Sequence, residues 1–262
     1  MASQPRLSVV EEFIESKDCR RLFLRCWRPG SVRAVVAIVH ERGSHSGQYR
    51  LFSEALAARG IATYAVDLRG CGRSPGSRFQ LRPIDGYLCD TRTMMSRISE
   101  RDPTRPLYLF GHGAGAVVAC LHALRHRDEL DGIICEGITL DPPRNAAILG
   151  IFSGLAPSFF WLAGTTLLRA NDRLREALGE LSLPLLLLHG SEDMMAPPSG
   201  SEYLHGHVGS RDKTLQVFEG YYHDLINDHG HAIVREKTCQ WIEAQLNSSA
   251  GRRRMGIEYI NE

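Results

Sequence analysis

The stretch 106-PLYLFGHGAGA-116 decides the fold. Its apolar residues Leu107–Phe110 predict a short strand, and the small residues Ala116–Leu124 predict a helix. Between them stand three alternating glycines. They do not form a dinucleotide-binding loop, because alanine replaces its third glycine, and no Lys-Ser or Lys-Thr pair follows as in a P-loop. The segment therefore predicts a tight turn from a sheet strand into a helix.

Strand, glycine-rich turn and helix are also the layout of the nucleophile elbow, whose signature is G-x-S-x-G. Gly113 stands where that signature has serine. The residue at the tip of such a turn has a positive φ, which glycine adopts without steric cost. We expect Gly113 to keep the shape of the elbow and to lack its attacking oxygen. The alternative at this point is an ordinary turn with three glycines.

Composition limits the class of protein. The chain has 262 residues, of which 43% are hydrophobic, and this predicts a single domain over 1–262. A net charge of +1 provides no field for binding nucleic acid. The seven cysteines form no C-x-x-C pair, so we expect no metal site, no cofactor and a reducing compartment. No signal peptide is recognised at the N-terminus, and a cytoplasmic location is expected.

Strands and helices alternate along the chain, which predicts an α/β fold with a mostly parallel central sheet flanked by helices. The predicted strands are Val9–Ser16, Arg21–Trp27, Ala34–His40, Ile61–Val66, Leu107–Phe110, Gly132–Cys135, Pro184–His189 and Thr214–Phe218. The predicted helices are Tyr49–Arg59, Ile84–Glu100, Ala116–Leu124 and His231–Leu246.

Two segments fall outside this alternation. Residues 141–181 are helical in tendency and predict a short lid inserted in the domain. Within them Ala146–Leu168 carries no charge over 23 residues, long enough to span a bilayer. Glycines, a proline and hydroxyl side chains lower the hydrophobicity of this stretch, and a membrane span there would divide the sheet. We therefore expect a lid that covers an apolar pocket and touches at most a membrane surface. Residues 247–262 predict a flexible basic tail.

Five motifs in order make the chain resemble the α/β-hydrolases of the monoacylglycerol lipase and lysophospholipase group (serine aminopeptidase S33-like), over about residues 8 to 246. The group's HGxGEHSGRY is matched by 40-HERGSHSGQY-49, and its D-x-RGHGxS by 67-DLRGCGRS-74. Its elbow GHSxGG is matched by 111-GHGAGA-116, its acid motif HGxxD by 189-HGSED-193, and its histidine motif EGxxH by 219-EGYYH-223. The resemblance implies an α/β-hydrolase fold.

It also implies roles for individual residues. Asp193 would hold the imidazole of His223, fix its tautomer and stabilise its charged form. The backbone N–H groups of Ala114 and Arg42 would form the oxyanion hole. The other histidines of these motifs, at positions 45, 112 and 189, are expected to order loops.

The chain departs from the family pattern at four places. Gly113 replaces the nucleophile, Glu41 replaces a glycine, Cys71 replaces a histidine and Glu136 stands where the family usually has serine. All four lie at the carboxyl ends of strands, where α/β folds bind ligands, so Glu41 and Glu136 are candidate pocket residues. The alternative is that both point to solvent or pair with arginines at positions 42 and 69.

Three functions remain open. The first is an enzyme that uses the His223–Asp193 dyad for acid/base chemistry on an apolar acyl or polyketide-like molecule, non-hydrolytic or atypically hydrolytic, with space for water above Gly113. The second is a lipase-like carboxylic ester hydrolase whose serine has been removed. The third is a catalytically silent binding protein, which the intact acid–histidine pair disfavours. The expected partner is an apolar small molecule, and the oligomeric state stays open.

Overall fold

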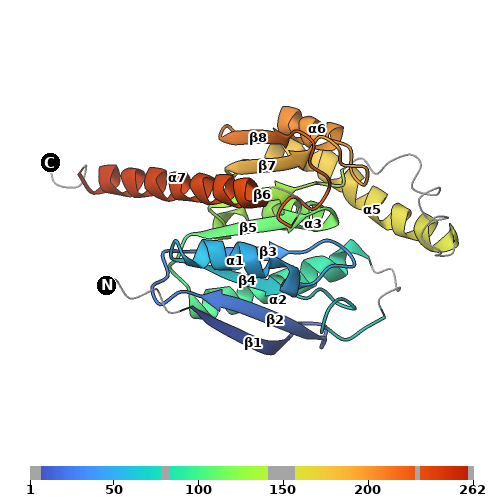
Figure 1. Cartoon of the computed structure of the whole chain (residues 1–262), viewed down its shortest axis with the longest axis horizontal. Coiled ribbons are helices and arrows are strands. Elements are labelled where there is room, and N and C mark those ends of the chain that lie inside the picture. The colour runs from blue at the N-terminus through green and yellow to red at the C-terminus, as the bar shows by residue number, and fades with distance from the viewer. Residues whose placement is uncertain (1–6, 78–82, 141–156, 228–230, 259–262) are drawn as a thin grey trace.

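The computed structural model describes residues 7–77, 83–140, 157–227 and 231–258. Its centre is an eight-stranded sheet in the order β1-β2-β4-β3-β5-β6-β7-β8 (Figure 1). The strands are β1 Ser8–Glu15, β2 Arg21–Arg28, β3 Ala34–Val39, β4 Ile61–Val66, β5 Leu107–His112, β6 Gly132–Glu136, β7 Leu185–Gly190 and β8 Lys213–Phe218. All eight predicted strands are present, with ends shifted by at most a few residues.

The sheet is antiparallel only at β1-β2 and β2-β4, and parallel from β4 to β8. The carboxyl ends of β3, β5, β6, β7 and β8 therefore lie along one edge. The register pairs Val39 with Gly111 and His112 with Glu136, so the last residues of three neighbouring strands stand side by side. Side chains in the loops that directly follow these strands therefore lie close to one another.

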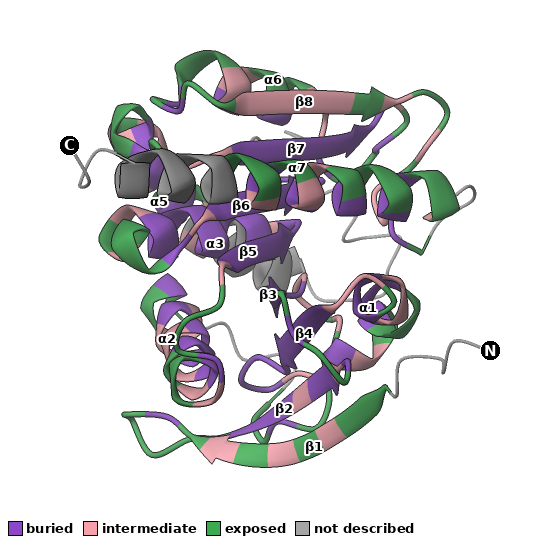
Figure 2. Cartoon of the chain, turned by 90° about the vertical axis from the view of Figure 1, so that its left-hand side faces the viewer, coloured by how far each residue is buried: buried purple, intermediate pink, exposed green. Residues whose placement is uncertain are grey.

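The strands are buried because helices cover both faces. Along β3 the side chains alternate: Val35, Ala37 and Val39 belong to one apolar cluster, and Ala34, Val36 and Ile38 to the other. Figure 2 shows the inner strands buried between the helices, whereas β1 alternates between exposed and half-buried residues. The continuous apolar runs in the sequence follow from this double burial.

The helices are α1 Arg50–Ala57, α2 Ile84–Arg101, α3 Ala114–Arg125, α5 Pro157–Ala177, α6 Ser199–His207 and α7 His231–Glu258. Residues of α1 and α7 join the cluster that holds Ile38, and residues of α2, α3 and α5 join the cluster that holds Val35. Helix α6 was not predicted. Its two glycines lower helix propensity.

The predicted lid and tail fall partly outside the described residues. Of 141–181, residues 141–156 are not described, and α5 begins at Pro157. Helix α7 continues to Glu258, so the predicted helix end at Leu246 is wrong and residues 247–258 are helical. The flexibility of residues 247–262 is not tested and stays a prediction. The lid at 141–181 and the single domain over 1–262 also stay predictions.

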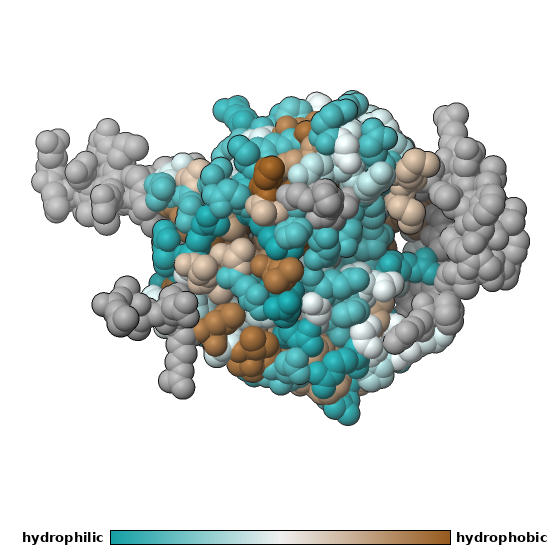
Figure 3. All heavy atoms as spheres, in the orientation of Figure 1, coloured by the Kyte–Doolittle hydropathy of each residue, from teal (hydrophilic) through white to brown (hydrophobic). Residues whose placement is uncertain are grey.

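The surface shows no broad apolar face on the side drawn in Figure 3, where hydrophobic residues form small separate groups among hydrophilic ones. Within the described ranges, no helix has the length and hydropathy needed to cross a membrane.

Candidate active site

The turn between β5 and α3 has the geometry expected of an elbow. Gly113 has φ 56° and ψ −118°, in the left-handed range that favours glycine. Its N–H donates to the carbonyl of Glu136 at 2.9 Å, which ties the turn to the end of β6. The neighbouring Gly111 and Gly115 permit close packing, since a Cβ on either would overlap backbone atoms of α3 or β3. The predicted positive φ at position 113 is confirmed.

Asp193 and His223 are joined by a hydrogen bond. Nδ1–H of His223 donates to Oδ2 of Asp193 at 2.6 Å. The other carboxylate oxygen, Oδ1, accepts N–H bonds from Met195 and Ala196, each at 2.8 Å. These bonds fix a fully buried carboxylate beneath the imidazole. The structure therefore contains the contact that the motifs predict, whereas the catalytic roles of the two residues stay predictions.

Glu41 occupies the space above Gly113. Its Oε2 accepts a hydrogen bond from Nε2 of His223, and the backbone N–H of Ala114, close to the carboxylate, helps to lower the pKa of Glu41. A Cβ built on Gly113 would overlap this carboxylate. The predicted space for a water above Gly113 is therefore wrong: a side chain from the loop after β3 fills it.

The protonation states of Asp193, His223 and Glu41 follow from the contacts among them. Burial alone would lower the pKa of His223, but the bonds to Asp193 and Glu41 outweigh it and raise that pKa to about 10. Burial would raise the pKa of Glu41, but the bond from His223 and the nearby His112 bring it below its usual value. The pKa of Asp193 is also lowered, because hydrogen bonds from His189 and His223 outweigh burial. At neutral pH the site is an imidazolium between two carboxylates.

The two predicted oxyanion donors, Ala114 and Arg42, both lie near Glu41. The N–H of Ala114 lies close to the carboxylate of Glu41. Arg42 lies half-buried in the loop that follows β3, next to Glu41 in the chain. An incoming substrate carbonyl would compete with a carboxylate for the Ala114 donor.

Glu136, at the end of β6, is fully buried. Its Oε1 accepts the N–H of Ile226 at 2.8 Å, and burial raises its pKa to about 7. Arg69 pairs instead with Asp90 and Asp18. The alternative that both glutamates face solvent or pair with arginines is therefore wrong for Glu136, and Glu41 pairs with a histidine.

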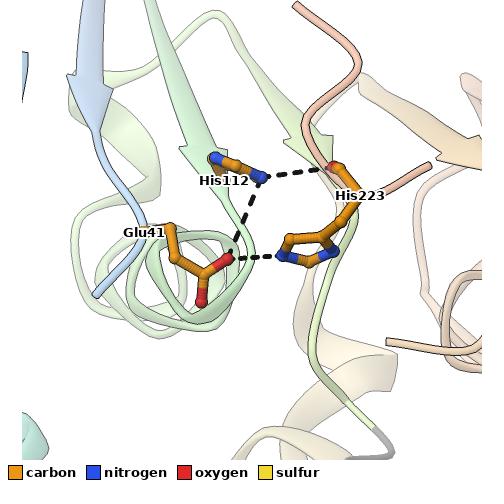
Figure 4. Close-up of side chains that lie close together, drawn as sticks. All are labelled: Glu41, His112 and His223. Atoms are coloured by element: carbon orange, nitrogen blue, oxygen red, sulfur yellow. Dashed lines mark hydrogen bonds and ion pairs between the residues drawn. The ribbon is translucent and has the colours of Figure 1, made fainter. Parts of the chain in front are cut away.

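His112 is a site residue that the sequence reasoning missed. It ends β5, is 5% exposed, and its Nε2 lies 3.9 Å from Oε2 of Glu41. Its ring centre lies 4.9 Å from that of His223 (Figure 4). The signal in the sequence is its place directly before Gly113. By contrast, His45 and His189 do order loops, by bonding Gly47 and Ala196.

Among the residues that the structure describes, two groups of three side chains bring metal-ligating atoms within 4.8 Å of one another. They are Glu41, His112 and His223, and His112, Glu136 and Asp224.

The model of the serine aminopeptidase, S33 family matches residues 30–163 and 156–230 of the chain. The chain belongs to this family. Among its relatives, a monoacylglycerol lipase of Mycolicibacterium smegmatis is 26% identical over 263 residues, which cover 86% of this chain and 94% of the relative. The human monoglyceride lipase is 27% identical over 250 residues, covering 79% and 81% of the two chains.

Solved structures agree on the fold. A carboxyl esterase from Bacillus coagulans superposes with a TM-score of 0.76 over 92% of this chain and all of its own, at 17% identity. A monoacylglycerol lipase from Paleococcus ferrophilus gives 0.70 over 92% and 99%, at 22% identity. The chain therefore has the α/β-hydrolase fold, as its motifs predict.

Proposed function

We propose that the chain is a carboxylic ester hydrolase for apolar acyl esters that works by direct attack of water, with no serine nucleophile. The relatives favour this substrate class over a polyketide-like one, since those at 26% and 27% identity are named for monoacylglycerol or monoglyceride. In this proposal Gly113 marks the lost nucleophile, and the carboxylate of Glu41 takes over the place beside His223.

The observation that carries the proposal is the bond from His223 to Glu41 above Gly113. In a serine hydrolase the histidine contacts the attacking hydroxyl and acts as base. Here His223, with a pKa of about 10, already carries a proton at neutral pH, whereas Glu41 is ionised. The roles are therefore exchanged: Glu41 is the base and His223 the acid.

The reaction then proceeds in two steps. Glu41 takes a proton from water as the water oxygen bonds to the ester carbonyl carbon, and the carbonyl oxygen takes the N–H of Ala114. The bond from that carbon to the alcohol oxygen breaks, and His223 gives its proton to the leaving alkoxide. The proton on Glu41 returns to His223 across their hydrogen bond. Asp193 holds the imidazolium throughout.

A second candidate function, a catalytically silent binding protein, is supported by the same contact between Glu41 and His223 above Gly113. The carboxylate of Glu41 fills the space above Gly113 and must move before a substrate carbonyl can reach the Ala114 N–H, and a Glu41 that never moves would keep the site closed. This reading predicts that removing the carboxylate raises ester turnover or leaves it absent, whereas the proposed mechanism predicts that turnover falls.

The test is turnover of a p-nitrophenyl acyl ester and of a monoacylglycerol by the unaltered chain, Glu41→Gln and Glu100→Gln. Glu100 is a matched control, because its side chain is 63% exposed on α2. We expect turnover by the unaltered chain, a loss of about 10²-fold or more in kcat for Glu41→Gln, and none for Glu100→Gln. No turnover by the unaltered chain, or turnover unaffected by Glu41→Gln, would contradict the proposal.

A further inference from the structure

Three side chains from three elements converge on one point (Figure 4). Glu41 follows β3, His112 ends β5 and His223 follows β8. Each presents a ligand atom, and the three atoms lie within 4.8 Å of one another. A transition-metal ion bound about 2.0–2.2 Å from each would hold them at most about 4.4 Å apart. The widest separations must therefore shrink by about 0.4 Å, whereas Nε2 of His223 and Oε2 of Glu41, now in direct contact, must move apart to about 3.3–3.6 Å to admit the ion.

The two imidazoles are held as metal-binding imidazoles are. Metal-bound histidines generally have their other ring nitrogen hydrogen-bonded to a carboxylate or another polar group, which fixes the tautomer and the ring direction. Nδ1 of His223 donates to Asp193 at 2.6 Å, and Nδ1 of His112 lies 3.4 Å from the hydroxyl of Tyr49. Nε2 of His223 is thereby directed at Glu41, and Nε2 of His112 lies 3.9 Å from Oε2 of Glu41 and 3.3 Å from the carbonyl oxygen of His223, a contact that the ion replaces.

A second observation concerns a buried carboxyl group beside the same histidine. Oε2 of Glu136 is buried, and no described residue hydrogen-bonds to it. Its ligand atom lies within 4.8 Å of those of His112 and Asp224. A buried carboxyl oxygen without a partner is unusual in a folded protein, and either a proton on Glu136 or a nearby cation accounts for it.

The glycine at the elbow fits this arrangement. A Cβ at position 113 would overlap the Glu41 carboxylate, so any other residue there would displace one of the three ligands. The loss of the serine and the gain of Glu41 are therefore one change in the site.

We infer that Glu41, His112 and His223 form a divalent transition-metal site, best suited to Zn²⁺, whose bound water is the nucleophile of the hydrolysis. Two histidines, one glutamate and an open position for water form the ligand set of some catalytic zinc sites. The water's role rests on the function proposed above, whereas metal binding does not. This inference departs from the prediction, made from the sequence, that the chain has no metal or cofactor.

In the metal-bound site the ion replaces the proton that His223 shares with Glu41. A bound water has its pKa lowered to about 7 and releases a proton to solvent. The resulting hydroxide bonds to the ester carbonyl carbon, the bond to the alcohol oxygen breaks, and the leaving alkoxide takes a proton from solvent water. Atoms and charge balance to ester plus water giving acid plus alcohol.

The test uses the full chain, stripped with EDTA, dialysed and titrated with Co²⁺ and then Zn²⁺. We expect about one Co²⁺ per chain, with the visible absorption of a four- or five-coordinate ion, and displacement of that absorption by Zn²⁺. Absence of this spectrum, or binding that gives only the spectrum of hydrated Co²⁺, would overturn the inference.

Variants separate the site from surface histidines. His112→Ala and His112→Gln should weaken Co²⁺ binding by about 10²-fold or more, and Asp193→Asn by about 10- to 100-fold. His207→Ala, an exposed histidine on α6, is the matched control and should change nothing. Circular dichroism and melting temperature identify a variant that fails to fold. Equal loss in His112→Gln and His207→Ala would overturn the inference.

Ester turnover, measured on the stripped and the Zn²⁺-loaded chain, separates this inference from the proposed function. Turnover that appears only with Zn²⁺ supports the metal-bound water and serine-free ester hydrolysis, and it overturns the roles of Glu41 as base and His223 as acid. Equal turnover in the two forms overturns the metal-bound water and leaves the proposed function standing. A specific Co²⁺ spectrum with no turnover in either form overturns the proposed function, and with it the role of the water, but not the metal site.

Discussion

Restoring the serine alone should not produce an efficient serine esterase, because Gly113 and Glu41 fit each other. Gly113→Ser places a Cβ against the Glu41 carboxylate, which must then move by about 1 Å or more to reach an ordinary contact distance. The carboxylate also lies close to the Ala114 N–H on which the oxyanion depends. Gly113→Ser combined with Glu41→Gly removes both obstacles.

The size of the effect follows from the charge. A carboxylate about 3.5 Å from a developing oxyanion repels it by about 5 kcal/mol at an effective dielectric near 20, which corresponds to a rate factor on the order of 10³. Losing one oxyanion donor costs about 10²–10³ by itself. We therefore expect kcat/KM of Gly113→Ser to lie at least about 10³-fold below that of the double variant.

The assay is p-nitrophenyl ester turnover that a fluorophosphonate abolishes, together with the protein mass after that treatment. Gly113→Ala is the matched control, because it adds the Cβ without the hydroxyl. Only the double variant should show rapid, fluorophosphonate-sensitive turnover. If Gly113→Ser alone matches the double variant, Glu41 does not exclude the serine route, and the chain is an ordinary ester hydrolase that has lost its serine.

Three further predictions concern charge in the metal-free chain. NMR titration should find the pKa of His223 near 10, and Glu41→Gln should lower it by roughly 2, because one of two carboxylates is lost. Because folding raises the pKa of His223, protonation of His223 stabilises the folded chain fully below about pH 6.5, and this stabilisation is lost as pH rises through 10. The melting temperature should therefore fall between pH 7 and 10.5, and it should fall less in His223→Gln. Asp90→Asn should lower the free energy of unfolding in urea by about 2–4 kcal/mol, because it leaves the buried Arg69 with one charged partner. Asp18→Asn should lower it by less, because the carboxylate of Asp18 is 45% exposed.

The sheet could be predicted because a strand buried on both faces has a recognisable sequence pattern. Runs such as Ala34–Val39 and Leu185–Leu188 are apolar throughout, and a strand covered on both faces has that pattern. Helix α6 has no comparable mark, since its apolar positions are few and two glycines interrupt it. The end of α7 was missed because its last turns are polar and carry no amphipathic pattern.

The site could be predicted in part. Asp193 and His223 follow strands in recognisable motifs, and parallel strands bring their carboxyl ends together, so their contact follows from the sequence. The bond between Glu41 and His223 does not, because it joins side chains 182 positions apart and depends on the direction each takes. His112 was missed for the same reason: its neighbours in the chain are glycines, and only the register beside Glu136 and the loop carrying His223 shows what it faces.

The most direct test of a serine-free hydrolase is ester turnover by the unaltered chain after exposure to a fluorophosphonate, in the stripped and Zn²⁺-loaded forms. We predict that hydrolysis continues at its original rate and that the mass of the protein does not change. A phosphonylated protein that has lost its turnover would show that a serine still acts as nucleophile. No hydrolysis in either form would show that Glu41 closes the site rather than serving it.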